Sequence, residues 1–386
     1  MRSSFRHARA TVLVAAATML GPTAAAQAAP TIQPYRDASV PSGSRVPNDS
    51  RVDRQWAILN HGQRVNGTGG RRGADAAVSR AWRYARGKAT VVIAETDTGV
   101  DYTHPDLAAN VWTNPGGIGG CPAGSHGFDV LAGDCDPMDD EGVVGGHGTH
   151  VAGIMGAVAN NRIGVAGENW HVKILPVKWL GADGYGDTSA LIAALQQVLA
   201  AKRAGVPIHV VNDPSTFSGT AYSQALSDTI AELGANGILF VTASGNSGAS
   251  NDDVANRRYP CGYALANEIC VAASDQSDAL WGSSNWGRHT VDMAAPGTNI
   301  YSTLRGGRYG YVSGGSMASA QVAGAAALVL SVKPRSTASL KSLLLRSADP
   351  RPALRTKVRT GARLNVCRAV VTARLGSREA RRACAR

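Results

Sequence analysis

From residue 89 onward, short apolar runs rich in β-branched residues alternate with helical patterns. Five runs bounded by turn residues are predicted to be strands: Ala89–Ala94, Val172–Val177, Ile208–Val211, Ile238–Ala243 and Ile269–Ala273. Asp187–Ala204, with Thr188 or Ser189 as its cap and Gly205 at its end, and Ala221–Leu233 are predicted helices. This alternation predicts a three-layer α/β fold with a mostly parallel central sheet flanked by helices. In such sheets, functional residues lie at the carboxyl ends of the strands.

Size and composition favour a single large domain. The chain has 386 residues, of which 44% are hydrophobic and only 5% aromatic, and it contains 45 glycines. No internal repeat and no Pro- or Ser-rich linker divides it. A chain of this length fits one domain of roughly 300 residues with short segments at both ends.

The first 28 residues have the pattern of a signal peptide. Basic residues precede the apolar run Ala10–Leu20, and Ala26-Gln27-Ala28 supplies small residues for cleavage. We therefore expect a secreted, extracellular protein. A membrane anchor is the alternative, but the apolar run is too short to span a bilayer, and no later stretch is expected to be long enough.

Six cysteines in an exported chain predict three disulfides. The short separations favour Cys121–Cys135, Cys261–Cys270 and Cys367–Cys384, each of which closes a local loop. Six cysteines allow fifteen pairings, so other connectivities stay open. A zinc site is less favoured, because the chain has no CxxC or HExxH spacing.

The positive charge is concentrated at the C-terminus. The formal net charge is +11, and the segment 351–386, with eleven basic residues and one glutamate, carries +10 of it. A basic tail on a nearly neutral body differs from a nucleic-acid-binding face spread over a fold, so no specific nucleic acid is expected. The tail is either a solvated, solubilising end or a contact with an anionic envelope or polyanion.

Two motifs place an acid and a base beside predicted elements. Asp97 follows a predicted strand directly, and Gly99 permits a sharp turn after it. His147 lies where a loop enters a helix, flanked by glycines that let a substrate backbone approach. His150 comes about one helical turn later and is expected to point elsewhere. A metal site with both histidines is the competing interpretation, but no third ligand is near in the sequence.

The third motif, Ser313–Ala318, opens the apolar helix Met317–Leu330. This helix is apolar on all sides and is therefore predicted to be buried. Ser316 at its N-terminus has unpaired backbone N–H groups and the positive end of the helix dipole beside it. Both favour negative charge that develops on a substrate oxygen. A plain helix cap is the alternative role for this serine.

With these three motifs in this order, the chain resembles the subtilisin-like serine peptidases, the subtilase family. The resemblance runs from about residue 46 to residue 365. It implies a secreted endopeptidase in which Ser316 is the nucleophile, His147 the general base and Asp97 the residue that orients this base. We expect polypeptide substrates, no cofactor for catalysis and a monomer.

The resemblance assigns further residues around the nucleophile. Asn246 is expected to bind the oxyanion together with the backbone N–H of Ser316, and Ser244 and Gly245 are expected in the substrate site. Ser247 stands where some relatives carry an acidic residue. It predicts a neutral rim of the specificity pocket, which favours apolar or uncharged substrate side chains over basic ones.

Two further sites follow from the resemblance. Gly184, Tyr185 and Gly186 match an edge segment that pairs with the extended backbone of the substrate. Asp106 and Asn161 match side-chain ligands of a structural Ca²⁺ site, and backbone carbonyls must complete this site.

The chain departs from the family pattern at several positions. Gly315 replaces a threonine before the nucleophile, and Ala320-Gln321 replaces a Pro-His pair. Glu95 stands where the family carries apolar residues, and a buried carboxylate there needs a partner or a raised pKa. Asp213-Pro214 interrupts a substrate-binding strand, because proline lacks a backbone donor. These departures support an alternative, a secreted and catalytically impaired homologue that binds peptides.

These interpretations divide the chain into four segments. They are a signal peptide over 1–28, a short linker or propeptide remnant over 29–45, a subtilisin-like peptidase domain over 46–373 and a basic tail over 374–386. A Cys367–Cys384 bridge would hold this tail against the domain as a compact positive patch.

Overall fold

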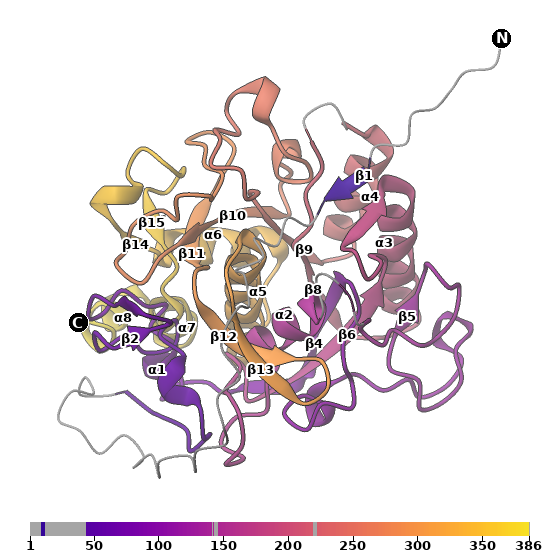
Figure 1. Cartoon of the computed structure of the whole chain (residues 1–386), viewed down its shortest axis with the longest axis horizontal. Coiled ribbons are helices and arrows are strands. Elements are labelled where there is room, and N and C mark those ends of the chain that lie inside the picture. The colour runs from indigo at the N-terminus through magenta and orange to yellow at the C-terminus, as the bar shows by residue number, and fades with distance from the viewer. Residues whose placement is uncertain (1–8, 12–43, 141, 143–145, 219–221, 386) are drawn as a thin grey trace.

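The computed structural model describes residues 9–11, 44–140, 142, 146–218 and 222–385. The predicted signal peptide and the linker after it therefore lie almost wholly outside the described residues. In Figure 1, the helices surround a central sheet.

The central sheet has nine strands in the order β14-β15-β11-β10-β9-β8-β4-β6-β5. All neighbours are parallel except β14 and β15. In chain order the strands are β4 (Gly87–Asp97), β5 (Phe128–Asp129), β6 (His171–Lys178), β8 (Ile208–Asp213), β9 (Leu239–Ala243), β10 (Glu268–Ser274), β11 (Met293–Pro296), β14 (Asp349–Pro350) and β15 (Ala362–Arg363). The five predicted strands are thus confirmed as β4, β6, β8, β9 and β10, and so is the mostly parallel α/β fold.

Helices cover both faces of this sheet, because its inner strands β4, β6, β8, β9 and β10 carry buried apolar residues on both sides. Along β4, Ile93 packs into one core with α2, α5 and α7, whereas Val92 and Ala94 pack into a second core with α3 and α4. The helices are α1 (Val78–Ala81), α2 (His147–Gly156), α3 (Thr188–Arg203), α4 (Gln224–Ala235), α5 (Gly315–Val332), α6 (Thr337–Ser347), α7 (Val366–Leu375) and α8 (Ser377–Ala383). The predicted three layers are therefore present.

Short strands outside the central sheet form three pairs. They are β1 (Arg9–Thr11) with β7 (Tyr185–Asp187), β2 (Arg64–Val65) with β3 (Thr68–Gly69), and β12 (Ile300–Leu304) with β13 (Arg308–Val312). All three pairs are antiparallel.

The predicted helix starts were partly wrong. The cap of α3 is Asp187, whose side chain accepts a hydrogen bond from the Ala190 N–H at 2.8 Å, and not Thr188 or Ser189. Helix α4 begins at Gln224, three residues later than predicted, and Ser223 is its cap. In both cases a side-chain oxygen just outside the helix satisfies an N–H of the first turn.

Helix α5 forms the centre of the larger core. It is buried from Gly315 to Ser331, as its uniformly apolar sequence predicts. Among the described residues it is the one helix whose length and composition would suit a membrane span, so the expectation that no later stretch is long enough was wrong. However, 94% of that window is buried inside the protein, which is typical of a core helix.

All three predicted disulfides are confirmed, namely Cys121–Cys135, Cys261–Cys270 and Cys367–Cys384. The third links α7 to the end of α8, and it buries Ala380 and Cys384 in the larger core. The tail therefore folds against the domain as a short helix rather than extending from it. Its described arginines stay exposed at positions 374, 378, 381 and 382.

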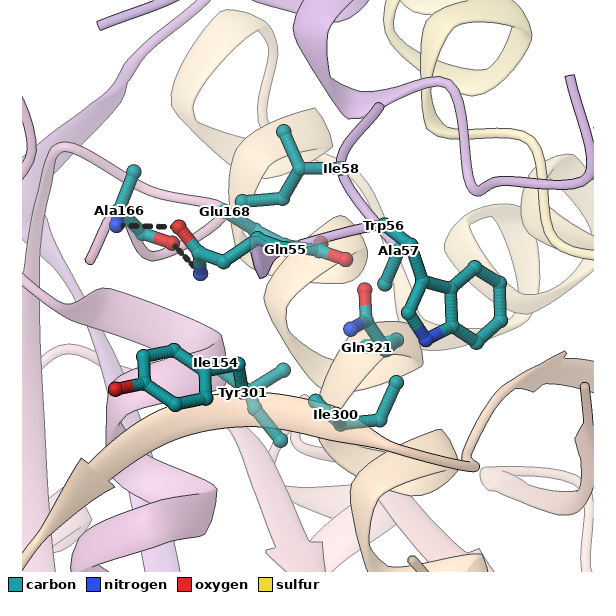
Figure 2. Close-up of a pocket in the computed structure, with 10 residues that line it drawn as sticks. All are labelled: Gln55, Trp56, Ala57, Ile58, Ile154, Ala166, Glu168, Ile300, Tyr301 and Gln321. Atoms are coloured by element: carbon teal, nitrogen blue, oxygen red, sulfur yellow. Dashed lines mark hydrogen bonds between the residues drawn. The ribbon is translucent and has the colours of Figure 1, made fainter. Parts of the chain in front are cut away.

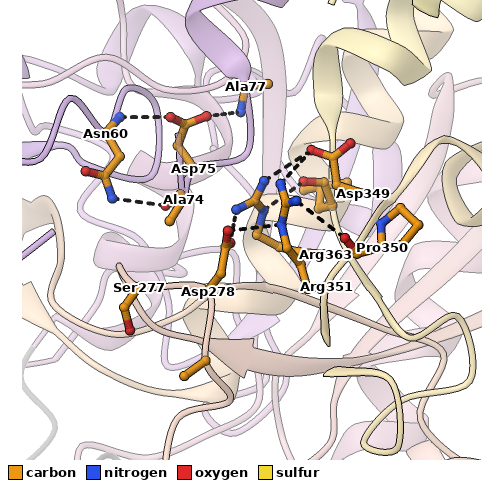
Figure 3. A network of polar contacts seen from close by, with 12 residues as sticks. Asn60, Ala74, Asp75, Ala77, Ser277, Asp278, Asp349, Pro350, Arg351 and Arg363 are labelled. Atoms are coloured by element: carbon orange, nitrogen blue, oxygen red, sulfur yellow. Dashed lines mark hydrogen bonds and ion pairs between the residues drawn. The ribbon is translucent and has the colours of Figure 1, made fainter. Parts of the chain in front are cut away.

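A buried ion-pair network closes the C-terminal part of the domain (Figure 3). Arg363 is fully buried and pairs with both Asp278 and Asp349. Arg351 contacts the same two carboxylates at 3.0 Å each, and Arg368 reaches Asp349 at 2.8 Å. This network joins β14 and β15 to a loop about 70 residues earlier in the chain.

We expect Arg363→Met to lower the free energy of unfolding by about 3–5 kcal/mol, because it leaves two buried carboxylates without their innermost partner. Urea unfolding followed by circular dichroism measures this loss. Arg355→Met is the matched control, since Arg355 is exposed and should change stability by no more than about 0.5 kcal/mol. Equal stabilities of the two variants would contradict a structural role for the network.

Candidate active site

Asp97 is the last residue of β4, which lies between β6 and β8 in the sheet. The carboxylate is therefore at the carboxyl end of an inner strand, where function was expected. Gly99 makes the turn after it with φ of +108°, and a Cβ there would lie 2.5 Å from the Pro137 carbonyl oxygen. Only glycine fits this turn.

His147 is the first residue of α2, and its ring meets Asp97. The Nδ1–H donates to the Asp97 carboxylate, with Oδ1 at 2.7 Å and Oδ2 at 2.9 Å, and both side chains are buried. Burial lowers the pKa of His147, but the charge and the hydrogen bond of Asp97 outweigh it, so the pKa is raised overall. A proton on Nδ1 leaves Nε2 as the acceptor, and Nε2 has no hydrogen-bond partner in the described part of the chain.

Ser316 is the second residue of α5, which packs against both α2 and β4. Its side chain is therefore carried to the side of the sheet where His147 lies. Between Ser316 and His147 Nε2, no hydrogen bond is formed among the described residues. Such contacts often tighten only when substrate binds.

Asn246 lies at the N-terminus of α5. Its Oδ1 accepts a hydrogen bond from the Gly315 N–H at 2.8 Å, so the amide is fixed one residue before Ser316. Ser244 follows β9, donates its hydroxyl to the Asn285 carbonyl at 2.8 Å and is fully buried, so it supports this loop. Gly245 adopts φ of +110°, which turns the chain between these two residues.

The predicted edge at Gly184, Tyr185 and Gly186 is present as β7 and the residue before it. The N-terminal strand β1 pairs with β7 in antiparallel register, with Ala10 opposite Gly186 and Thr11 opposite Tyr185. This edge is therefore able to accept an extended segment through backbone hydrogen bonds.

Asp139 supports the start of α2, and the sequence analysis did not identify it. It accepts hydrogen bonds from the Thr98 hydroxyl at 2.8 Å and from the N–H and hydroxyl of Thr149 at 2.9 and 2.6 Å. Thr98 in turn accepts the Gly148 N–H at 3.0 Å. Burial raises the pKa of Asp139 to about 6 despite these donors. The carboxylate thus joins the turn after Asp97 to the helix that carries His147.

Two more buried acids surround Asp97. Burial raises the pKa of Glu95 well above its usual value, and the charges of Asp97 and Asp139 add to this shift. The sequence predicted that a buried Glu95 needs either a partner or a raised pKa. Neither of its carboxylate oxygens has a hydrogen-bond partner within the described residues, so the raised pKa is the alternative that the structure supports. Burial also raises the pKa of Asp213 to about 8, although the Ser215 hydroxyl donates to it at 2.8 Å.

His150 points away from this site, as expected. Its Nε2 lies 3.0 Å from the Ile300 carbonyl and 3.2 Å from that of Gly310, so this nitrogen carries the proton. Burial lowers the pKa of His150 to about 3, which keeps the ring neutral. It fixes the β12–β13 hairpin to α2.

The predicted calcium ligands lie together. The Asn161 amide donates to Asp106 Oδ1 at 2.7 Å, and the Val165 N–H donates to Oδ2 at 2.8 Å. Asp49, which the sequence analysis missed, holds the same loop through the Asn160 N–H at 2.8 Å. Burial raises the pKa of Asp49 to about 6, and the charge of Asp106 adds to this shift. The two carboxylates are hard oxygen donors of the kind that Ca²⁺ prefers. The Asn161 amide turns its N–H to Asp106, while its Oδ1 accepts from the Ile163 N–H at 2.9 Å, so it would have to turn over to bind a cation.

A small cavity lies beside α5, and neither Asp97, His147 nor Ser316 lines it (Figure 2). Glu168 and Gln321 line it, and both oxygens of Glu168 and Oε1 of Gln321 lack partners in the described part of the chain. The cavity volume of about 10 Å³ leaves room for roughly one water molecule. Gln321 is one of the departures from the family.

Comparison with known protein families agrees with the arrangement of Asp97, His147 and Ser316 described above. Residues 88–369 match the model described as "Subtilase family". The thermophilic serine proteinase of Bacillus sp. (strain AK1) is 36% identical over 269 residues, which are 70% of this chain and 59% of that protein. Thermitase of Thermoactinomyces vulgaris is 34% identical over 270 residues, which are 70% of this chain and 85% of thermitase. The chain thus spans about three fifths of the first relative.

Solved structures are similar too. A protease from Pseudoalteromonas arctica PAMC 21717 superposes with a TM-score of 0.69 at 28% identity, covering 85% of this chain and 99% of that one. A cold-adapted subtilisin-like serine proteinase superposes with a TM-score of 0.59 at 29% identity, covering 72% and 88% of the two chains.

We expect Asp139→Asn to lower the pKa of His147, because the Asp139 charge adds to that of Asp97 in stabilising the imidazolium. An NMR titration of the His147 ring measures the shift without any substrate. Asp140→Asn is the matched control, since Asp140 is half exposed and pairs with Lys178 at 2.6 Å. An unchanged pKa of His147 in Asp139→Asn would show that the Asp139 charge does not stabilise the imidazolium.

Proposed function

The chain belongs to the subtilase family, and from this membership we propose that it is a secreted serine endopeptidase with Asp97, His147 and Ser316 as its triad. The observation that carries the proposal is the Asp97–His147 hydrogen bond of 2.7 Å at the end of β4. It lies on the side of the sheet where α5 brings Ser316. Acid, base and nucleophile thereby come from three elements far apart in the sequence.

In this mechanism, His147 Nε2 takes the proton of the Ser316 hydroxyl as the serine attacks the substrate carbonyl. The proton then passes to the leaving amine, and Asp97 stabilises the imidazolium in between. Asn246 and the backbone N–H of Ser316 bind the oxyanion, helped by the positive end of the α5 dipole. No cofactor takes part in these steps.

The substrate is a polypeptide in extended conformation. Its backbone adds a strand to Tyr185 and Gly186 of β7, in the way that β1 pairs there. Gly184 has φ of +76°, which turns the chain into this edge, and Gly245 turns the chain before Asn246. Ser244 is buried and acts from below, by holding this loop to Asn285. Each contact is made to backbone, so this edge by itself selects extended conformation rather than sequence.

We expect Ser316→Ala to lower kcat/KM for an unstructured protein by at least about 10⁴-fold while the melting temperature stays the same, and His147→Ala to do nearly as much damage. Hydrolysis of a quenched fluorescent peptide measures the loss. Unchanged turnover in Ser316→Ala would remove the central assignment.

A peptide-binding homologue without activity is the second candidate, and Gly315, Gln321 and Asp213-Pro214 are the observations that favour it. A fluorophosphonate probe separates the two, because it reacts only with an activated serine. Labelling of the native protein, but not of Ser316→Ala, supports the peptidase. Absence of labelling, together with peptide binding, supports the homologue.

We further propose that Asp106, Asn161 and Asp49 hold a structural Ca²⁺, together with backbone carbonyls. The carbonyls are needed, because the described ranges contain no cluster of three or more acidic, His or Cys side chains that could hold a metal. Bound calcium would offset the repulsion between Asp49 and Asp106.

We expect calcium to raise the melting temperature, since a ligand at 100 times its dissociation constant stabilises the native state by about 2.7 kcal/mol. Differential scanning calorimetry with calcium and with a chelator measures the shift. Asp106→Ala should abolish the response, whereas Asp228→Ala, on the exposed face of α4, should retain it. A melting curve that calcium does not move would refute the site.

The basic tail supports a contact with an anionic envelope. Arg374, Arg378, Arg381 and Arg382 are exposed on α7 and α8, and the Cys367–Cys384 bridge holds them beside the domain. Four cations in a folded patch attract an anionic polymer more strongly than the same charges on a mobile tail, because less ordering entropy is lost.

A further inference from the structure

Arg258 lies across the loop that carries Asn246. Its Nη2–H donates to Ser247 Oγ at 3.2 Å. The aliphatic part of the Arg258 side chain packs against Gly245, the residue before Asn246. A Cβ added to Gly245 would lie 3.2 Å from Arg258 Cγ. The side chain therefore contacts both neighbours of the proposed oxyanion residue.

The surrounding hydrogen bonds hold Arg258 in this position. Ser247 donates its N–H and its hydroxyl to Asn285 Oδ1, both at 2.8 Å, so its oxygen is left to accept from Arg258. The next residue, Tyr259, exchanges two backbone hydrogen bonds with Phe217, at 2.7 and 3.1 Å. The Arg258 guanidinium is thus held by Ser247, and the Arg258 backbone is held by the hydrogen bonds of the adjacent Tyr259.

No carboxylate of the described residues neutralises the charge of Arg258. Among the described residues, no carboxylate lies within ion-pair distance of it. A guanidinium has five N–H donors, and Ser247 is the single acceptor found for them in this part of the chain. The side chain is partly exposed, so the remaining donors are available to a ligand.

We propose that Arg258 makes this peptidase select an acidic side chain on the residue that bears the attacked carbonyl. The proposal rests on the proposed function, because Asn246 must hold that carbonyl oxygen for the adjacent side chain to reach Arg258. A guanidinium pairs with a carboxylate through two parallel hydrogen bonds, which an amide or an alkyl group cannot replace. The neutral rim predicted from Ser247 is therefore positively charged, and basic substrate side chains are repelled.

The test uses four quenched peptides that differ only at this residue, which is Glu, Gln, Leu or Lys. For the native enzyme, kcat/KM for Glu should exceed that for Gln by at least about tenfold, the lower value for a hydrogen bond to a charged group. Arg258→Gln should abolish this ratio, and Arg258→Glu should reverse it in favour of Lys. Such a reversal would not follow from a merely structural role.

Arg257→Gln is the matched control. Arg257 is the adjacent arginine, but its Nε–H donates to the Asn251 carbonyl at 3.4 Å and its stem packs against Gly262, away from Asn246. This variant should keep the native ratio. Equal turnover of the Glu and Gln peptides by the native enzyme, or an unchanged ratio in Arg258→Gln, overturns the proposal.

A binding measurement keeps this test separate from that of the proposed function. Fluorescence anisotropy with Ser316→Ala, using labelled product peptides that end in Glu or Gln, reports the preference without hydrolysis. Tighter binding of the Glu peptide, lost in the Ser316→Ala and Arg258→Gln double variant, supports the proposal even if no peptide is cleaved. Equal affinities overturn it. Absence of both cleavage and probe labelling would instead overturn the proposed function alone.

Discussion

The burial of α5 is the constraint on which the rest of the structure depends. The helix is apolar on every face and packs against β4, β8, β9, β10, α2 and α7, so it lies on one face of the sheet and is covered by other helices. Its N-terminus consequently reaches the carboxyl ends of the strands, where Asp97 and Asn246 lie. The bond from Gly315 N–H to Asn246 Oδ1 then fixes the position at which Ser316 enters the site.

A second constraint is the number of carboxyl groups that this core contains. Glu95, Asp139 and Asp213 are all buried near Asp97, and burial raises the pKa of each. Ionising several of them together would place like charges in a medium that solvates them poorly. Glu95 and Asp213, whose pKa values are raised furthest, avoid this repulsion by staying protonated. The departures from the family at Glu95 and Asp213 are therefore tolerated as neutral acids.

The substrate side of the site combines a general and a selective part. The β7 edge offers backbone groups that suit extended chains of many sequences. Selectivity must come from side chains, and the proposed source is Arg258, whose guanidinium donates to Ser247, the residue after Asn246. The local loop is rigid, because Asn285 holds Ser247 while Asn251 holds Asn285 at 2.9 Å.

The sequence by itself determined the five inner strands, the buried helix and the order of the three motifs, and it favoured the three disulfides among the fifteen pairings that six cysteines allow. These features follow from local patterns: apolar runs, glycine turns and short cysteine separations. Only the tertiary structure placed Asp139 under α2, Asp49 beside Asp106, and Arg363 between Asp278 and Asp349. It also placed Arg258 over Asn246, twelve residues away along the chain. No local pattern marks these residues, because a charged side chain is recognised as buried or unpaired only when distant segments have packed around it.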